Sequence, residues 1–191
     1  MSHFQENLTK YMDAGFPILY VDTTEEDKAE SIVCDLNKHR GIIKWDIRGF
    51  QDLQDKSTMT GQNLETTLEV LLSDKKNLNH KAVILKDVHF FLEEPAIVSR
   101  LKTLAQLINS GEIEDCTIII IAPVLKVPVD LESFITVLNL DYLSSSEIKS
   151  MISDFVNEND LSKLNDTFLD ELAVTFKGLT EAEINKFWLW Q

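Results

Sequence analysis

The sequence predicts an α/β fold: a five-stranded, largely parallel sheet with helices on both faces, followed by a small helical subdomain. Five short runs rich in β-branched residues alternate with helical patterns, and such alternation is typical of parallel strands joined by crossovers. The runs AVILKD and TIIIIA are almost entirely apolar, as expected for central strands that are buried on both faces. The β-runs stop near residue 140, and only helical patterns follow.

The β-runs and the patterns between them define the expected elements of the core. A first helix is expected to begin at Thr24, whose hydroxyl can cap it with Asp27 three positions later, and Gly41 is expected to end it. A polar stretch over 49–61 is expected to be the most mobile loop. Further helices are expected over 63–72 and from Pro95 to a stop at Gly111. The five predicted strands are residues 17–22, 42–47, 82–87, 117–122 and 135–140.

The last part of the sequence is expected to form three helices, over residues 145–157, 166–176 and 180–190. Two of them open with capping boxes, in which a Ser or Thr is followed three residues later by Glu: Ser144 with Glu147, and Thr180 with Glu183. We therefore expect an α/β core over residues 1–143 and a helical lid subdomain over residues 144–191.

Composition excludes several classes of partner. The chain has 32 acidic and 18 basic side chains and a formal net charge of −14, and such a charge repels nucleic acid. No apolar run approaches the roughly 18 residues of a membrane span, and the first ten residues lack the pattern of a signal peptide. Cys34 and Cys116 are interpreted as buried thiols. We expect a cytoplasmic protein with no nucleic-acid or membrane partner.

The turn after the first strand lacks the features of a phosphate-binding loop, although the scaffold is of the kind that carries one. Such a loop needs the pattern GxxxxGK followed by Ser or Thr, so that backbone N–H groups surround the anion and a lysine meets its outer charge. Residues 22–26 read DTTEE, with no glycine and with three carboxylates that repel phosphate. This disagreement between scaffold and loop is the main clue to function.

Four phrases of the sequence carry a resemblance to a known family. They are AGFPILYVDTTEEDKA (14–29), KAVILKDVHFFLEEPAIVSRLKTLA (81–105), TIIIIAPVLKVPVDLESFITVLNLDY (117–142) and GLTEAEINKF (178–187). These phrases resemble the N-terminal half of a bacterial and plastid group of AAA-family ATPases, in which a degenerate AAA-like domain precedes an intact ATPase domain. The resemblance implies a P-loop-NTPase-like, AAA-type three-layer sandwich with a helical lid. It also implies that such relatives continue past residue 187 into the functional ATPase domain.

Carried over residue by residue, the resemblance implies that the catalytic parts are lost. Lys86 and Asp87 stand where a competent module has the Walker B pair Asp-Glu, which holds Mg²⁺ and polarises the attacking water. Lysine cannot ligate a cation. The polar sensor beyond the fourth strand is replaced by residues 122–125, APVL, and no arginine is placed as an arginine finger.

We therefore expect no catalytic residue, no metal site and no cofactor in this chain, with ATP and Mg²⁺ bound by an associated intact domain. Four residues remain candidates for a degenerate nucleotide pocket: Thr23, Thr24, Lys86 and Asp87. The leading hypothesis is a catalytically inactive AAA-like domain that assembles with an intact ATPase domain, other subunits or a client protein. The alternative is an atypical, weak nucleotide-binding ATPase domain that uses the helix N-terminus at Thr23 and Thr24 as its anion site. A third hypothesis is a stand-alone regulator that binds protein through residues 188–190.

Carboxylates at the strand ends leave other interpretations open. A phosphoacceptor receiver domain gathers acids at this edge, but it also needs a hydroxyl after its fourth strand and a lysine after its fifth, and this sequence has neither. An unspecific divalent-cation site built from the same oxygens stays open as an alternative. The favoured interpretation is a solvated acidic rim in which Lys86 neutralises Asp87 or a neighbour. The acids concerned are Asp22, Glu25, Glu26, Asp87 and Asp141.

An aromatic segment follows the third predicted strand. His89 lies two residues beyond Asp87, and we expect it to cap the strand end or to pack beside Phe90 and Phe91 rather than to act in catalysis. The apolar triplet of Phe90, Phe91 and Leu92 is suited either to an interaction surface or to burial under the loop over 49–61.

Overall fold

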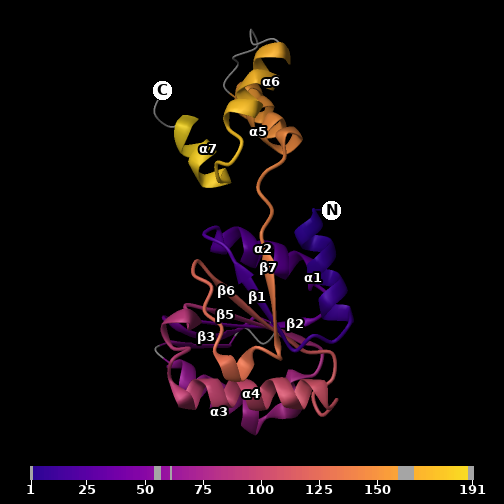
Figure 1. Cartoon of the computed structure of the whole chain (residues 1–191), viewed down its shortest axis with the longest axis vertical. Coiled ribbons are helices and arrows are strands. Elements are labelled where there is room, and N and C mark those ends of the chain that lie inside the picture. Colours follow the sequence, from indigo (N-terminus) through magenta and orange to yellow (C-terminus); the bar gives the residue numbers. More distant parts are fainter. Residues whose placement is uncertain (1, 54–56, 61, 159–165, 189–191) are drawn as a thin grey trace. The chain divides into compact units, whose positions relative to one another are not determined.

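The computed structural model describes residues 2–53, 57–60, 62–158 and 166–188 (Figure 1). It forms two compact units, Met1–Leu140 and Asp141–Gln191. The first unit holds the sheet and the helices that cover it, and the second holds only helices. Among the described residues, no helix combines the length and the apolar character needed to cross a membrane.

The described part of the first unit contains one sheet of seven strands in the order β4-β3-β2-β5-β6-β1-β7. Its five parallel strands lie where the five apolar runs predicted them, and the three-layer α/β sandwich is confirmed. These strands are β1 (Ile18–Asp22), β2 (Gly41–Asp46), β5 (Lys81–Lys86), β6 (Thr117–Ala122) and β7 (Ile135–Asn139).

The prediction of a loop over 49–61 was wrong, because two further strands form there beside the five parallel ones. β3 (Gly49–Asp52) and β4 (Ser57–Thr60) extend the sheet in antiparallel pairing beyond β2, while residues 54–56 and 61 lie outside the described part. The stretch lacks a β-branched run, so its strand character comes from pairing with β2 rather than from its own propensity. A buried ion pair also holds it, because Lys81 Nζ of β5 lies 2.8 Å from Asp52 Oδ2 of β3.

Helices cover both faces of the sheet (Figure 1). Because side chains alternate along a strand, Ile118 and Ile120 of β6 face one apolar cluster, while Ile119 and Ile121 face the other. The first cluster is closed by α3 (Leu64–Ser73) and α4 (Pro95–Asn109), and the second by α1 (His3–Asp13) and α2 (Glu26–Leu36). Short 3-10 turns complete the unit: η1 (Lys75–Leu78), η2 (Val88–Phe90) and η3 (Val129–Leu131).

Helix α1 was not predicted, although the sequence carries its signal. Ser2 and Gln5 form a capping box, with the Gln5 N–H donating to Ser2 Oγ at 3.3 Å and the Ser2 N–H donating to Gln5 Oε1 at 2.9 Å. Its buried residues Phe4, Leu8 and Met12 recur every fourth position, which places them on one helix face.

The prediction that α2 begins at Thr24 and ends at Gly41 was wrong. The helix begins at Glu26 after the N-cap residue Glu25, which makes no side-chain cap, and it ends at Leu36. The hydroxyl that acts in this turn belongs to Thr23, whose Oγ1 accepts from the Glu25 N–H at 3.0 Å. Gly41 begins β2 instead.

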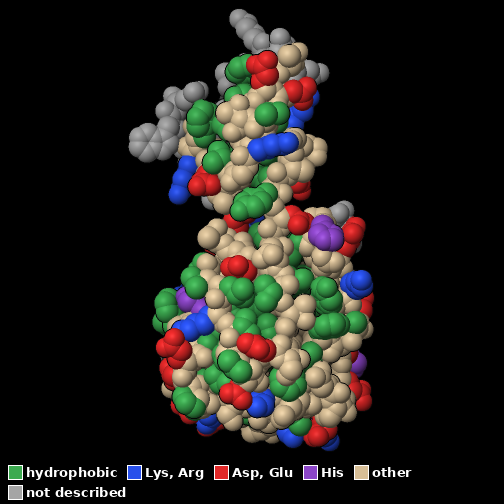
Figure 2. All heavy atoms as spheres, in the orientation of Figure 1, with side chains coloured by type: hydrophobic (Ala, Val, Ile, Leu, Met, Phe, Trp, Pro, Cys, Tyr) green, Lys and Arg blue, Asp and Glu red, His purple; other side chains and the backbone are tan. Residues whose placement is uncertain are grey.

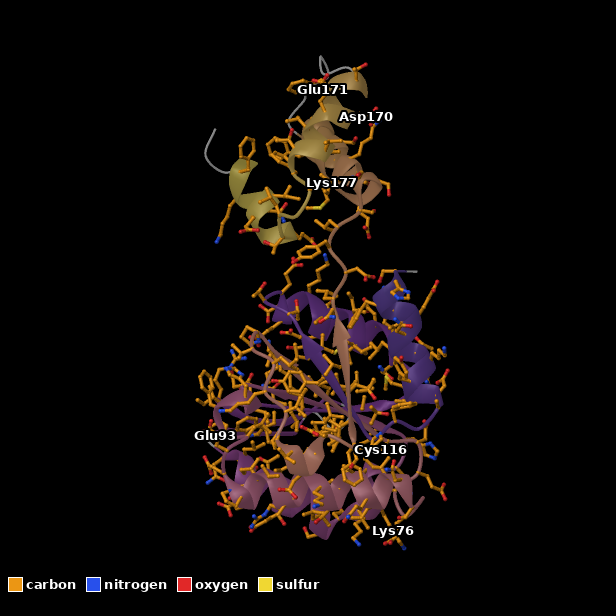
Figure 3. The ribbon with its side chains drawn as sticks, viewed as in Figure 1. Lys76, Glu93, Cys116, Asp170, Glu171 and Lys177 are labelled. Carbon is orange, nitrogen blue, oxygen red and sulfur yellow. The ribbon has the colours of Figure 1, made fainter. Side chains whose placement is uncertain are left out.

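The second unit consists of α5 (Ser145–Glu158), α6 (Asp166–Thr175) and α7 (Glu181–Trp188) in its described part. Both predicted capping boxes are confirmed, since the backbone N–H groups of Ser144 and Thr180 donate to Glu147 and Glu183 at 2.8 Å. Lys149 of α5 forms an ion pair at 2.7 Å with Asp170 of α6, and Figure 3 labels Asp170. Residues 189–191, including Trp190, lie outside the described part.

Both cysteines are free thiols. Cys116 is buried, as predicted, and burial raises the pKa of its thiol to about 12 (Figure 3). Cys34 is only half-buried, which corrects the prediction, because it lies on the outer part of the α2 face. Burial also raises the pKa of Cys34, so neither thiol has the lowered pKa of a reactive cysteine.

The burial of β6 gives a direct test of the core. Ile119 is fully buried, so Ile119→Ala is expected to lower the free energy of unfolding by about 2–5 kcal/mol. Ile47 follows β2 and is exposed, so the matched change Ile47→Ala is expected to cost about 0.5 kcal/mol or less. Urea unfolding measures both, and equal losses would contradict this description of the core.

Candidate functional site

The candidate site lies at the carboxyl ends of β1, β2, β5 and β6, the edge at which open α/β sheets bind ligands. Alternation along β5 places Lys86 on the same face as Ala82 and Ile84, which belong to the cluster closed by α1 and α2. The side chain of Lys86 therefore points toward α2 and not along the strand.

Lys86 is held by two carboxylates of α2. Its Nζ lies 2.8 Å from Asp27 Oδ1 and 3.1 Å from Glu30 Oε2, and its side chain is only 10% exposed. Lys44 of β2 donates to the other oxygen of Glu30, so two lysines share this acid. Desolvation lowers the pKa of Lys86, but the hydrogen bonds to Asp27 and Glu30 outweigh it, and the pKa is raised above its ordinary value. Lys86 is a charged, structurally bound cation.

Asp87, the next residue, makes a different contact. Its backbone lies in the left-handed region, with φ at 60°, and its Oδ2 accepts from the Ile47 N–H at 3.2 Å. Asp87 thus leaves the strand that was predicted to include it and connects the end of β5 to the turn after β2. Lys86 neutralises carboxylates of α2 rather than Asp87.

The two threonine candidates lie in the turn between β1 and α2. The Thr23 N–H donates to the Ala122 carbonyl at 3.0 Å, and its hydroxyl accepts from Glu25, so both groups serve the turn. Thr24 is exposed at the bend. The structure therefore brings Thr23 and Thr24 to one turn but gives Lys86 and Asp87 separate partners.

Glu26 and Asp27 are adjacent residues with opposite electrostatic environments. Burial raises the pKa of Glu26, with nearby Asp87 adding to the rise against an opposing effect of Lys86. The hydrogen bond from Lys86 lowers the pKa of Asp27. Glu26 was predicted only as part of the acidic rim, and Asp27 was not a site candidate, because their interactions with Lys86 and Asp87 join parts of the sequence that lie far apart. Among the described residues, no group of three or more His, Cys, Asp or Glu side chains is arranged to hold a metal ion.

The aromatic segment after β5 divides between core and surface. The Phe91 ring contacts Trp45 edge to face at 5.9 Å between centroids, and Leu92 is buried. Phe90 is exposed, and its ring lies 4.0 Å from that of His89. Of the two alternatives left open for this triplet, burial holds for Leu92, while Phe90 is exposed as an interaction surface requires.

The fold and this edge together define a class. A parallel sheet in the order β2-β5-β6-β1-β7, with helices on both faces and a helical unit after it, is the architecture of an AAA-type ATPase domain. The family model described as "SpoVK-like AAA ATPase, N-terminal domain" matches residues 4–140, and the chain belongs to this family.

Similar proteins agree with this assignment. The chain is 28% identical over 188 residues to "Uncharacterized AAA domain-containing protein ycf46" of Guillardia theta, covering 96% of this chain and 36% of that protein. It is 27% identical over 187 residues to the protein of the same name from Trieres chinensis, covering 96% of this chain and 37% of that one. The chain thus spans little more than a third of the length of these relatives.

Solved structures share the fold at low sequence identity. PCH-2 of C. elegans has a TM-score of 0.63 at 11% identity, covering 97% of this chain and 61% of that one. A RuvB variant of Thermotoga maritima has a TM-score of 0.54 at 12% identity, covering 89% of this chain and 54% of that one. These similarities support the AAA fold alone.

The opposite pKa directions of Glu26 and Asp27 predict opposite pH effects. The pKa of Glu26 is raised in the folded state, so the free energy of unfolding falls as pH rises through that pKa and Glu26 ionises. Glu26→Gln removes this cost and is therefore expected to increase the free energy of unfolding near pH 7. The folded pKa of Asp27 is lowered, so its contribution is present above the unfolded pKa of about 3.9 and is lost at lower pH. Asp27→Asn is therefore expected to decrease stability near neutral pH.

Urea unfolding of both variants between about pH 3 and about pH 7 measures these differences, which are expected to stay within about 1 kcal/mol because Asp27 is exposed. Both differences are expected to shrink as pH falls toward 3. Changes of the same sign in the two variants would contradict the described electrostatics.

Proposed function

We propose that this chain is a catalytically inactive AAA-like domain that assembles with, or positions, an intact ATPase domain. One observation carries the proposal. Lys86 ends β5 where a competent module places the aspartate that holds Mg²⁺, and it is bound to Asp27 and Glu30. A cation at this position repels Mg²⁺, and two hydrogen bonds to carboxylates already hold it within the domain.

The turn after β1 adds to this argument. A triphosphate at the α2 N-terminus would meet Glu25, Glu26 and Asp27 in the first turn and its flank. To recruit Lys86, the nucleotide would have to break hydrogen bonds between charged groups, each of which contributes about 1.5–3 kcal/mol. None of the six glycines in the sequence is followed by lysine, so no phosphate-binding loop of the usual pattern exists elsewhere in it.

The curated relatives suggest the partner. They are called AAA domain-containing proteins, and this chain corresponds to 36–37% of their length. We propose that an intact AAA domain, in the same polypeptide or in another subunit, binds ATP and Mg²⁺ and performs hydrolysis. Under this proposal the complex acts in the cytoplasm, and a client protein is a further partner of the assembly.

A titration with ATP and Mg²⁺ tests the proposal. Ligand at one hundred times its dissociation constant stabilises a folded protein by about 2.7 kcal/mol, so binding would raise the midpoint of thermal unfolding. We expect no rise at millimolar ATP and no phosphate release. The variant Lys86→Ala is titrated beside the unmodified chain, because this change removes the cation from the Walker B position.

Two results would overturn the proposal in favour of an atypical ATPase domain. One is micromolar ATP affinity of the unmodified chain. The other is phosphate release that Asp87→Ala abolishes while the neighbouring change Asp22→Ala does not.

A further inference from the structure

Four large apolar side chains are exposed at the edge that would carry nucleotide in a competent module. Ile47 is 62% exposed, Phe90 66%, Val124 56% and Leu125 47%. Each follows the end of a parallel strand: β2, β5, or β6 for the last two. Exposed apolar side chains that gather on one edge mark interaction sites more often than single ones do.

Hydrogen bonds and an ion pair show that the loops carrying these residues are neighbours. Asp87 accepts from the Ile47 N–H at 3.2 Å and, through its carbonyl, from the Phe90 N–H at 3.2 Å. Lys126, next to Leu125, pairs with Glu93 at 2.7 Å, which joins the loops after β5 and β6. Figure 3 labels Glu93 at this part of the sheet unit. The strands themselves are adjacent in the order β2-β5-β6.

The loops are also anchored by contacts with side chains of the strands. The Tyr20 hydroxyl donates to the Val124 carbonyl at 2.7 Å, and the Phe91 ring contacts Trp45 beneath the turn that presents Phe90. Phe90 is therefore displayed by a turn whose other side is anchored in the core. An exposed aromatic on a supported turn is the kind of residue that dominates the affinity of protein interfaces.

The charges around the four side chains favour a basic partner. Asp22 ends β1, Glu25, Glu26 and Asp27 lie at the start of α2, and Asp87 and Glu93 follow β5. The cations near the four side chains are each paired with a carboxylate of the domain: Lys44 and Lys86 with Glu30, Lys126 with Glu93, and the exposed Arg48 with Asp46. Figure 2 shows acidic side chains among hydrophobic ones on the visible face of the sheet unit. A second copy is disfavoured, because two chains of net charge −14 repel each other.

We infer that the edge formed by Ile47, Phe90, Val124 and Leu125 docks a protein segment that presents apolar side chains flanked by lysine or arginine. The inference rests on the proposed function and deepens it, because it assigns the surface and the chemistry of the partner. Apolar contact supplies the affinity, and the acidic surround selects a basic segment over an acidic one.

Three synthetic amphipathic peptides serve as probes. The first carries Leu and Phe on one face and Lys on the other, the second replaces Lys by Glu, and the third replaces Leu and Phe by Ser. Binding is measured by fluorescence anisotropy and located by amide chemical-shift changes. The variant Phe90→Ser with Leu125→Ser removes the docking residues. The matched control, Val70→Ser with Val137→Ser, removes exposed apolar side chains on α3 and β7.

The first peptide is expected to bind and to shift the amide signals of Ile47, Phe90 and Leu125. Its affinity for the docking variant is expected to be at least about tenfold lower, since loss of one hot-spot residue alone reaches this effect. Its affinity for the control variant is expected to be unchanged. The other two peptides are expected to bind at least about tenfold more weakly. Equal binding of the serine peptide, equal binding of the glutamate peptide, shifts elsewhere, or no binding would each overturn the inference. An ATP titration in parallel keeps the two proposals apart, since nucleotide binding would overturn the proposed function whatever the peptides do.

Discussion

The ion pairs between Lys86 and the two acids of α2 are the constraint on which the candidate site depends. Lys86 ends a central strand and its side chain is only 10% exposed, so its charge must be compensated locally. Asp27 and Glu30 provide this compensation, and Lys44 completes it from the next strand. Because these four groups pair with one another, α2 is tied to β2 and β5 at the carboxyl end of the sheet.

This arrangement changes what the edge of the sheet can do. In a phosphate-binding module, positive charge and free N–H groups face outward at this edge and attract an anion and its metal. Here Lys44 and Lys86 are largely buried against Glu30, the exposed Arg48 is paired with Asp46, and acids and apolar side chains also face solvent. Under the proposed function, the same scaffold presents a surface suited to a protein rather than to a nucleotide, and membership of a family of N-terminal domains is consistent with that role.

Sequence patterns predicted the parts of the fold that depend on local composition. The apolar runs located the five parallel strands, and the capping boxes at Ser144 and Thr180 located two helices. The hairpin of β3 and β4 was missed because its strand character comes from pairing with β2 and from the Lys81 to Asp52 contact. Helix α1 was missed although Ser2 and Gln5 signal it, because its apolar face is narrow and only three of its residues are buried.

The candidate site was less predictable, for a physical reason. The family resemblance implied that Lys86 stands in the place of a metal-binding aspartate. Its partners Glu30 and Asp27 lie 56 and 59 residues away, and only the packing of α2 against the sheet brings them to it. Thr24 was predicted to cap the helix, but the helix begins after Glu25 and the hydroxyl that accepts a backbone N–H belongs to Thr23, because spacing alone does not fix the turn geometry. The exposure of Phe90 beside the burial of Leu92 likewise follows from the 3-10 turn and not from composition.

A double-mutant cycle on Lys86 and Glu30 tests the central claim most directly. Lys86→Met, Glu30→Gln and the double variant are compared with the unmodified chain by urea unfolding near pH 7, with Lys102 and Asp130 as an exposed control pair. Two partly buried groups in contact are expected to show a coupling energy of about 1–3 kcal/mol, against less than about 0.5 kcal/mol for the control. Additive effects of the two changes would mean that Lys86 is not bound to α2. They would contradict the claim that ion pairs within the domain close this edge of the sheet to nucleotide.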